Sequence, residues 1–231
     1  MWPRASAACG AVGAVLFVAG AFTAGSPLRP DAATPEIVTH LSADRDALLG
    51  GYLLSILGVA LLIWFVGYLV VFVASTEGER TPLSAITLAS WVGLLAVVFG
   101  GGMPLMAVVW SGAGQIDPGV VRFAFDGSNL SLYSISAPIA LISVLAPTIA
   151  IWRSGSLPRW LAALGVLEMA VNAVELVGLF SRSGDNAAGY AFGVGPVVWA
   201  AWVACVSIAM VLPARSGTTI ASARGTSSPA Q

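Results

Sequence analysis

The feature that most constrains this chain is its division into six long segments that are almost free of charge. Cutting the sequence at its charged residues leaves the segments 5–28, 47–76, 81–116, 127–152, 160–181 and 186–214. Each is long enough for the roughly 20 apolar residues that an α-helix needs to cross a bilayer. Only the fifth contains charged residues, which are two glutamates. The pattern predicts an all-α, polytopic transmembrane helical bundle.

Trimmed to helices, the six predicted spans cover residues about 6–25, 48–74, 84–110, 130–152, 160–181 and 190–212. They form one transmembrane domain over residues 1–213, followed by a polar, featureless stretch at 214–231 that we expect to be a disordered cytoplasmic tail. The first segment could also be read as a cleaved secretory signal. A retained helix is favoured because the segment is longer than the ~7–15-residue apolar core of a signal peptide.

Composition argues against a water-soluble domain, because only 9% of the residues are charged, against about 25% in ordinary soluble domains. The net charge of −1 creates no basic field for nucleic acid. The expected surroundings are therefore the lipid bilayer of a cell membrane, crossed several times, and the expected partners are another membrane protein or a second copy of the chain.

The placement of arginine predicts the orientation, because positive residues in short loops stay in the cytoplasm. The sequence has no lysine. One set of segment ends carries six arginines and two acids: Arg4, Arg80, Arg153, Arg159, Arg215, Arg224, Glu77 and Glu79. The opposite set carries four arginines and seven acids: Arg29, Arg45, Arg122, Arg182, Asp31, Glu36, Asp44, Asp46, Asp117, Asp126 and Asp185. Both termini are therefore expected on the cytoplasmic side.

Two external loops have patterns of their own. In the first, Thr34 and Pro35 are typical of a helix start, with Thr34 as the cap, and predict a short amphipathic helix lying on the outer surface. In the second, residues 117–126 include several apolar side chains, which predicts a loop resting at the membrane interface.

One short motif resembles a known family. The run IWRSGSLPRWLAALG at 151–165 is similar to the tight cytoplasmic turn between the fourth and fifth helices of a large bacterial family of six-span membrane proteins, itself catalogued as a domain of unknown function. The segment that begins at Pro30 is similar to the family's first loop. The resemblance implies the fold and the orientation, and it brings no catalytic or binding residues.

The fifth span carries a polar stripe made of Glu168, Asn172 and Glu175. At 100° per residue these side chains fall within an arc of about 60°, and the two carboxyl groups are about 10 Å apart along the helix axis. An ionised acidic residue at the centre of a span costs about 2.5–3.5 kcal/mol. No arginine lies in any predicted span, so protonation, a bound cation or a water-filled cavity must offset this cost.

Three interpretations of the stripe follow. The glutamates could be neutral and hydrogen-bonded to neighbours, for which the candidates are Asn172, Tyr52, Tyr68, Ser134, Ser136 and Trp199. They could instead form a functional pair that binds a proton, a cation or a cationic solute. They could also meet a positive charge on a partner protein.

The third span contains Gly100, Gly101, Gly102 and Pro104, a combination that predicts a helix break of the kind that lines substrate sites in some transporters. The alternative is a kink that allows close packing. On the same span, Ala85, Ala89 and Gly93 predict close approach of a neighbouring helix. Further kink candidates with the same alternative are Pro138 and Pro147 in the fourth span and Gly193, Gly195 and Pro196 in the sixth.

The function favoured by these features is passage of a solute or cation through a carboxylate-containing bundle interior. The alternative is a non-catalytic membrane scaffold or accessory protein that acts through a partner. Enzyme activity is not expected, because two carboxylates without an acid, base or metal-ligand set do not define a reaction. No metal site and no cofactor motif is predicted.

Overall fold

Helices make up the regular structure of the residues that the computed structural model describes, which are 2–25, 28–77, 82–177 and 187–212. Within these residues, six long helices form a bundle: α1 (Trp2–Thr23), α3 (Arg45–Thr76), α4 (Leu83–Ser111), α6 (Ser136–Ser154), α7 (Arg159–Val177) and α8 (Ala187–Val211). The shorter elements are α2 (Thr34–Ala43), the 3-10 helix η1 (Ala113–Gln115), α5 (Pro118–Asn129) and the π-helix η2 (Leu130–Ile135). The all-α prediction is confirmed, and the tail predicted at 214–231 lies outside the described residues.

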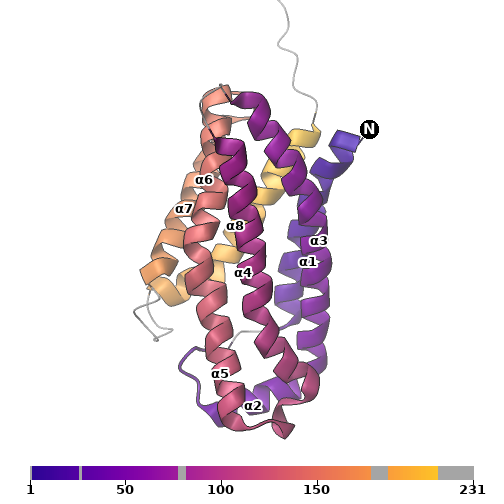
Figure 1. The fold of residues 1–231 in the computed structure, drawn as a ribbon, viewed down its shortest axis with the longest axis vertical. Coiled ribbons are helices and arrows are strands. Elements are labelled where there is room, and N and C mark those ends of the chain that lie inside the picture. The colour runs from indigo at the N-terminus through magenta and orange to yellow at the C-terminus, as the bar shows by residue number, and fades with distance from the viewer. Residues whose placement is uncertain (1, 26–27, 78–81, 178–186, 213–231) are drawn as a thin grey trace, which may run out of the picture.

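The six long helices form a closed ring. Each packs against the next along the chain, in the order α1, α3, α4, α6, α7 and α8. The ring closes because α8 also packs against α1 (Figure 1). Neighbouring helices run in opposite directions, as short connections between long helices require.

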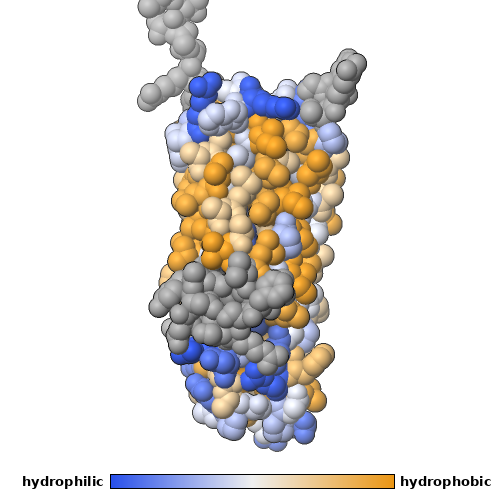
Figure 2. All heavy atoms as spheres, turned by 90° about the vertical axis from the view of Figure 1, so that its left-hand side faces the viewer, coloured by the Kyte–Doolittle hydropathy of each residue, from blue (hydrophilic) through white to orange (hydrophobic). Residues whose placement is uncertain are grey.

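Five helical segments within the described part of the chain are long and apolar enough to cross a membrane: Arg4–Thr23, Arg45–Thr76, Leu83–Ser111, Pro118–Ser154 and Val194–Val211. Apolar side chains form a broad band between two polar ends on the face seen in Figure 2. These features indicate an integral membrane protein. α7 is not among the five, and it is the helix that carries Glu168, Asn172 and Glu175.

The region of the predicted fourth span differs most from expectation. Residues 117–126 do not form an interfacial loop, because α5, η2 and α6 follow one another as one helical segment. Asp117 starts α5 by accepting hydrogen bonds from the backbone N–H of Gly119 at 2.8 Å and of Val120 at 3.3 Å, with Pro118 at the first position. Val121 and Phe125 then lie on the buried side of this helix.

α2, η1 and α5 form a cap at the end of the bundle where α3 begins (Figure 1). The short helix predicted after Thr34 is present, although Ala33 and not Thr34 is its N-cap residue. Its apolar residues Ile37 and Leu41 are buried in a cluster with residues of α4 and α5. The apolar side of α2 is therefore covered by protein and does not face lipid.

Arg122 ties this cap together. Its guanidinium donates hydrogen bonds to the carbonyl oxygens of Ala32 at 2.6 Å and Pro30 at 3.0 Å, and to the carboxylate of Asp126 at 2.8 Å. The loop before α2 is thereby bound to α5, and the loop carbonyls receive donors that they would otherwise lack.

The closest helix contact is between α1 and α3, and it depends on glycines. Gly13 faces Gly58, and Gly20 faces Gly51, so that a Cβ placed on either member of a pair would lie 2.5–2.7 Å from the carbonyl oxygen of the other. Glycine at both sides lets the two backbones touch, as small residues do in many membrane helix pairs. Of the three residues of α4 that predict a close contact, Ala85 and Ala89 are exposed. Gly93 does face a neighbouring helix, because a Cβ placed there would lie 3.6 Å from Ile139 of α6.

A serine joins the first and last helices of the ring. The hydroxyl of Ser207 on α8 donates to the carbonyl oxygen of Ala7 on α1 and accepts from the N–H of Ala11 at 2.8 Å. In a regular helix this carbonyl and this N–H would bond to each other. Ser207, which is fully buried, thus links α8 to the backbone of α1.

The half of the bundle farther from the cap is densely packed. Leu62, Phe65, Trp91, Leu161 and Trp202 are all fully buried in one continuous core cluster. The indole N–H of Trp91 on α4 donates to the carbonyl oxygen of Ser143 on α6 at 3.1 Å. Because this half is filled by side chains, an interior site can lie only in the half nearer the cap.

The glycine contact between α1 and α3 can be tested by replacing Gly58 with valine. Its Cβ would lie 2.7 Å from the carbonyl oxygen of Gly13, so overpacking should lower the free energy of unfolding by about 1–3 kcal/mol. Gly67→Val on the same helix is the matched control, because its Cβ meets no atom within 4 Å. Thermal unfolding in detergent should show a lower midpoint for Gly58→Val alone, and equal midpoints would contradict the contact.

Candidate functional site

The polar stripe of α7 faces the interior of the bundle. Glu168 is 0% exposed, and Asn172 and Glu175 are each 5% exposed. α7 lies between α6 and α8, as expected from the short connections of the chain. The three side chains therefore lie away from lipid, on the side of α7 where other helices can supply partners.

The stripe is only partly hydrogen-bonded. The amide of Asn172 donates to the backbone carbonyl of Glu168 at 3.0 Å and also to the Oε1 atom of that residue. Oε2 of Glu168 and Oε1 of Glu175 are buried and have no hydrogen-bond partner among the described residues. A buried polar atom without a partner costs about 1–3 kcal/mol, so a purely structural stripe would be expected to have its oxygens satisfied.

These side chains line a cavity of about 310 Å³ inside the ring. All six long helices contribute to its wall. It lies in the half nearer the cap, because its lining includes Tyr52 near the start of α3, Met106 near the end of α4 and Gly195 near the start of α8. The described part of the wall is mostly apolar and includes no arginine or histidine.

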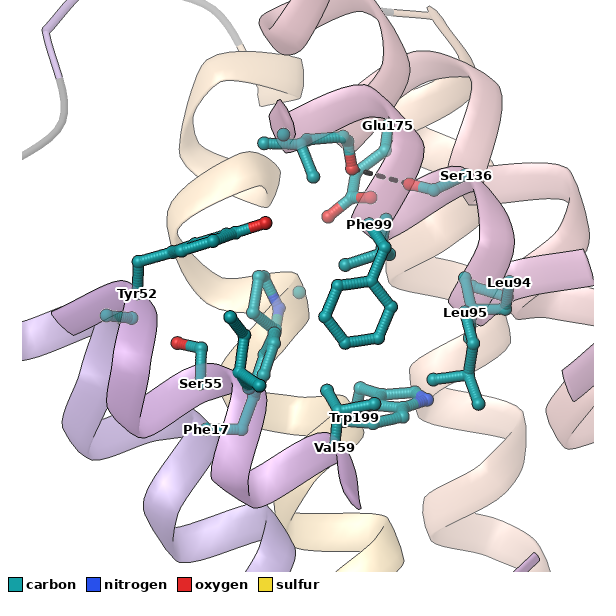
Figure 3. Close-up of a pocket in the computed structure, with 18 of the residues that line it drawn as sticks. Phe17, Tyr52, Ser55, Val59, Leu94, Leu95, Phe99, Ser136, Glu175 and Trp199 are labelled. Carbon is teal, nitrogen blue, oxygen red and sulfur yellow. Dashed lines mark hydrogen bonds between the residues drawn. The ribbon is translucent and has the colours of Figure 1, made fainter. Parts of the chain in front are cut away.

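The cavity has a polar end and an aromatic end. In Figure 3 the carboxyl group of Glu175 lies near Ser136 at one end, and the hydroxyl of Tyr52 points into the space from α3. Trp199 lies at the other end with Phe17 beside it, their ring centroids 5.6 Å apart. Trp199 also packs on Trp91, at 5.5 Å between centroids, so this end joins the packed half of the bundle.

Gly195 makes room for the carboxyl group of Glu175. A Cβ at this position would lie 1.9 Å from Oε1 of Glu175, so any larger residue on α8 would displace the carboxyl group. The sequence suggested Gly195 only as a kink candidate. Its actual role could have been found from the antiparallel pairing of α7 with α8, which places the start of one beside the end of the other.

The hydrogen-bond partners proposed for the glutamates are only partly present. Tyr52, Ser136 and Trp199 line the cavity, whereas Tyr68 and Ser134 do not. The hydroxyl of Ser136 donates to the backbone carbonyl of Leu132 on its own helix. Among the proposed partners, Asn172 is the one with a described hydrogen bond to a glutamate side chain.

The helix break predicted at Gly100, Gly101, Gly102 and Pro104 is not present, because α4 runs without interruption from Leu83 to Ser111. Inside a membrane, a broken helix would leave backbone N–H and C=O groups without hydrogen-bond partners. The helix therefore continues through Pro104, which removes one backbone hydrogen bond and leaves the others in place. The alternative of close packing applies at one of these residues. Gly101 accepts a hydrogen bond on its carbonyl oxygen from Ser128 at 2.7 Å and lies against Ser131 of η2.

Metal binding has no support in the described part of the chain, which holds no group of three or more His, Cys, Asp or Glu residues suited to a metal ion. No protein-family model, curated protein or solved structure matches the chain. The resemblance of residues 151–165 to a bacterial six-span family therefore stays a prediction. Function has to be inferred from the geometry of the cavity.

The packing of α4 beside the cavity predicts different effects for two adjacent glycines. A Cβ at Gly101 would lie 2.3 Å from Cβ of Ser131, whereas one at Gly100 meets nothing within 4 Å. Gly101→Ala should therefore lower the free energy of unfolding by about 1–3 kcal/mol. Gly100→Ala should leave it unchanged or raise it by up to about 1 kcal/mol, through the higher helix propensity of alanine. Equal thermal midpoints in detergent would show that Gly101 is not a packing contact.

Proposed function

We propose that this chain is a six-span protein of the cell membrane that binds a solute in its central cavity and gives it passage across the bilayer. Glu168, Asn172 and Glu175 are the groups that bind the solute. The observation that carries the proposal is that two buried carboxylate oxygens, which have no hydrogen-bond partner among the described residues, lie at a cavity to which all six long helices contribute.

α7 also crosses the membrane in this proposal, in spite of its polar residues, and brings the number of spans to six. Its glutamates and Asn172 are buried, while the side chains exposed on its outer surface are apolar, with Val166 57% and Leu167 53% exposed. A helix with this division meets lipid with apolar groups only. Its place in the ring between α6 and α8 fits the same conclusion.

Both termini are cytoplasmic in the proposed topology, which places the cap outside the cell. The excess of arginine at the opposite end supports this orientation. Three arginines at the cap end, Arg29, Arg45 and Arg122, each form an ion pair with an acid. Their charges are thus balanced locally and oppose an external location less than free arginines would.

The position of the cavity gives the passage a direction. It lies in the half near the cap, which is the outer half in this topology. The other half, toward the cytoplasm, is filled by the core around Trp91 and Trp202. A solute would therefore be bound from the outer side, and its release to the cytoplasm would require the packed half to open. A scaffold that acts through a partner is the alternative, and it would need no carboxyl groups accessible inside the ring.

The topology predicts the behaviour of reporter fusions. A reporter fused after Arg224 should be active as a cytoplasmic fusion, and one inserted near Ala33 should be active only as an external one. The five spans that follow the first loop separate these two sites and place them on opposite sides. If both reporters were external, an even number of spans would separate them, and α7 would have to be removed from the topology.

Access to the carboxyl groups can be measured with dicyclohexylcarbodiimide, which dissolves in the membrane and modifies protonated carboxyl groups. We expect mass spectrometry to find the adduct on Glu175 or Glu168, because both line the cavity. The exposed acids Glu36 and Asp46 serve as internal controls and should remain unmodified, since they lie at the polar cap end and not among the residues that line the cavity. The double variant Glu168→Gln, Glu175→Gln should lose the adduct. A folded protein that stays unmodified at both glutamates would favour the scaffold role.

A further inference from the structure

We infer that the cavity selects an organic cation with an apolar body, whose charged centre lies beside Glu175 and Glu168 and whose body lies against the aromatic end. This inference rests on the proposed function and names the class of solute. The arrangement that carries it is the pairing of unpartnered carboxylate oxygens with aromatic rings in one space.

The sign of the charge follows from the groups that line the cavity. Among the described residues of the wall, two carry carboxyl groups and none is basic. An anionic solute would be repelled by either carboxylate, and a neutral apolar solute would leave both oxygens without a partner. A cation compensates the charge of a carboxylate and removes most of the cost of keeping it in a membrane interior.

An inorganic cation fits the cavity poorly. Hard cations such as Ca²⁺ require about six to eight oxygen ligands at close range. The described residues hold no such group of acids, and the cavity wall consists mostly of hydrocarbon. The cavity volume of about 310 Å³ falls at the lower end of the range for organic ligands, about 300–1,000 Å³. A single metal ion would leave most of this space unfilled.

The aromatic residues supply the second half of the recognition. Phe17, Phe99, Tyr52 and Trp199 all line the cavity, and Figure 3 shows the ring of Phe99 between the carboxyl end and Trp199. Aromatic faces attract organic cations through the ring quadrupole, and the gain is larger where water is excluded. They also form an apolar surface for the rest of the solute, as in most small-molecule sites.

The test uses radiolabelled benzyltrimethylammonium, which combines a permanent positive charge with an aromatic body, and the full chain in nanodiscs of zwitterionic lipid. We expect saturable binding by equilibrium dialysis. Tetramethylammonium, which lacks the body, and phenylmethanesulfonate, which has the body with a negative charge, should compete at least about tenfold less well. If phenylmethanesulfonate competed as well as unlabelled benzyltrimethylammonium, the inference that the solute is positively charged would be overturned. If tetramethylammonium competed equally well, the inference that the solute has an apolar body would be overturned.

Variants separate the two halves of the site. Glu175→Gln keeps the shape of the side chain and should weaken binding by more than about 30-fold, as for loss of one partner of a buried charge pair. Phe99→Leu keeps an apolar side chain without a ring face and should weaken binding by about 2- to 30-fold. Glu36→Gln, an exposed acid of the cap, should bind like the unmodified chain.

Two results would overturn the inference and leave the proposed function intact. The first is that the unmodified chain shows no saturable binding of benzyltrimethylammonium. The second is that Glu175→Gln binds it as tightly as the unmodified chain does. Both apply to a protein whose glutamates still react with the carbodiimide. If the carbodiimide fails to react as well, the proposed function is overturned together with the solute class. The competition experiments use the unmodified chain, so they test the charge and the apolar body of the solute even if a substitution prevents folding.

Discussion

The arrangement of this bundle depends on keeping two carboxyl groups of α7 away from lipid. Hydrocarbon offers no hydrogen bonds and no counter-charge, so Glu168 and Glu175 define which side of their helix must face protein. α6 and α8 cover that side, and the apolar residues Val166 and Leu167 remain on the outside. Gly195 completes the arrangement, because its missing side chain leaves the space that the Glu175 carboxyl group occupies.

The two halves of the ring differ in how they use their interior. The half far from the cap is filled by large side chains, among them Phe65, Trp91 and Trp202. The half near the cap holds the cavity, with Trp199 at the boundary between the two. Dense packing at one end can hold the helices in place while the other end keeps an unfilled space, whose loss of dispersion contacts is a real cost to stability.

The sequence predicted the helices well and their mutual contacts poorly. Segment length and the absence of charge located α1, α3, α4, α8 and the start of α7 within a few residues, and the predicted end of the fifth span at 181 lies outside the described residues. The exception was α5, where Asp117 followed by Pro118 is a helix-start signal, while the apolar residues after it are also typical of an interfacial loop. Burial of Glu168, Asn172 and Glu175 followed from their shared helix face, because the spacing of three polar residues is a local property.

What the sequence could not predict depends on pairs of helices distant in the chain. The small residues Ala85 and Ala89 suggested a close contact but are exposed, whereas Gly13 and Gly58 form one. Small residues occur on many helix faces, and which of these faces forms a close contact depends on which helix packs beside it. The cavity was unpredictable for the same reason, since its wall draws Phe17, Tyr52 and Phe99 from three different helices.

The bond between Ser207 and the backbone of α1 has a consequence for biogenesis. Helices leave the ribosome in chain order, and α1 can pair with α3 early through their glycines. The hydrogen bonds between Ser207 and the backbone of α1 can form only after the last helix has been synthesised. The same delay applies to Glu175, whose carboxyl group packs against Gly195 of that helix. During translation the nascent chain is therefore an open arc with an unshielded acidic face, and insertion of the final helix both closes the arc and encloses the acids.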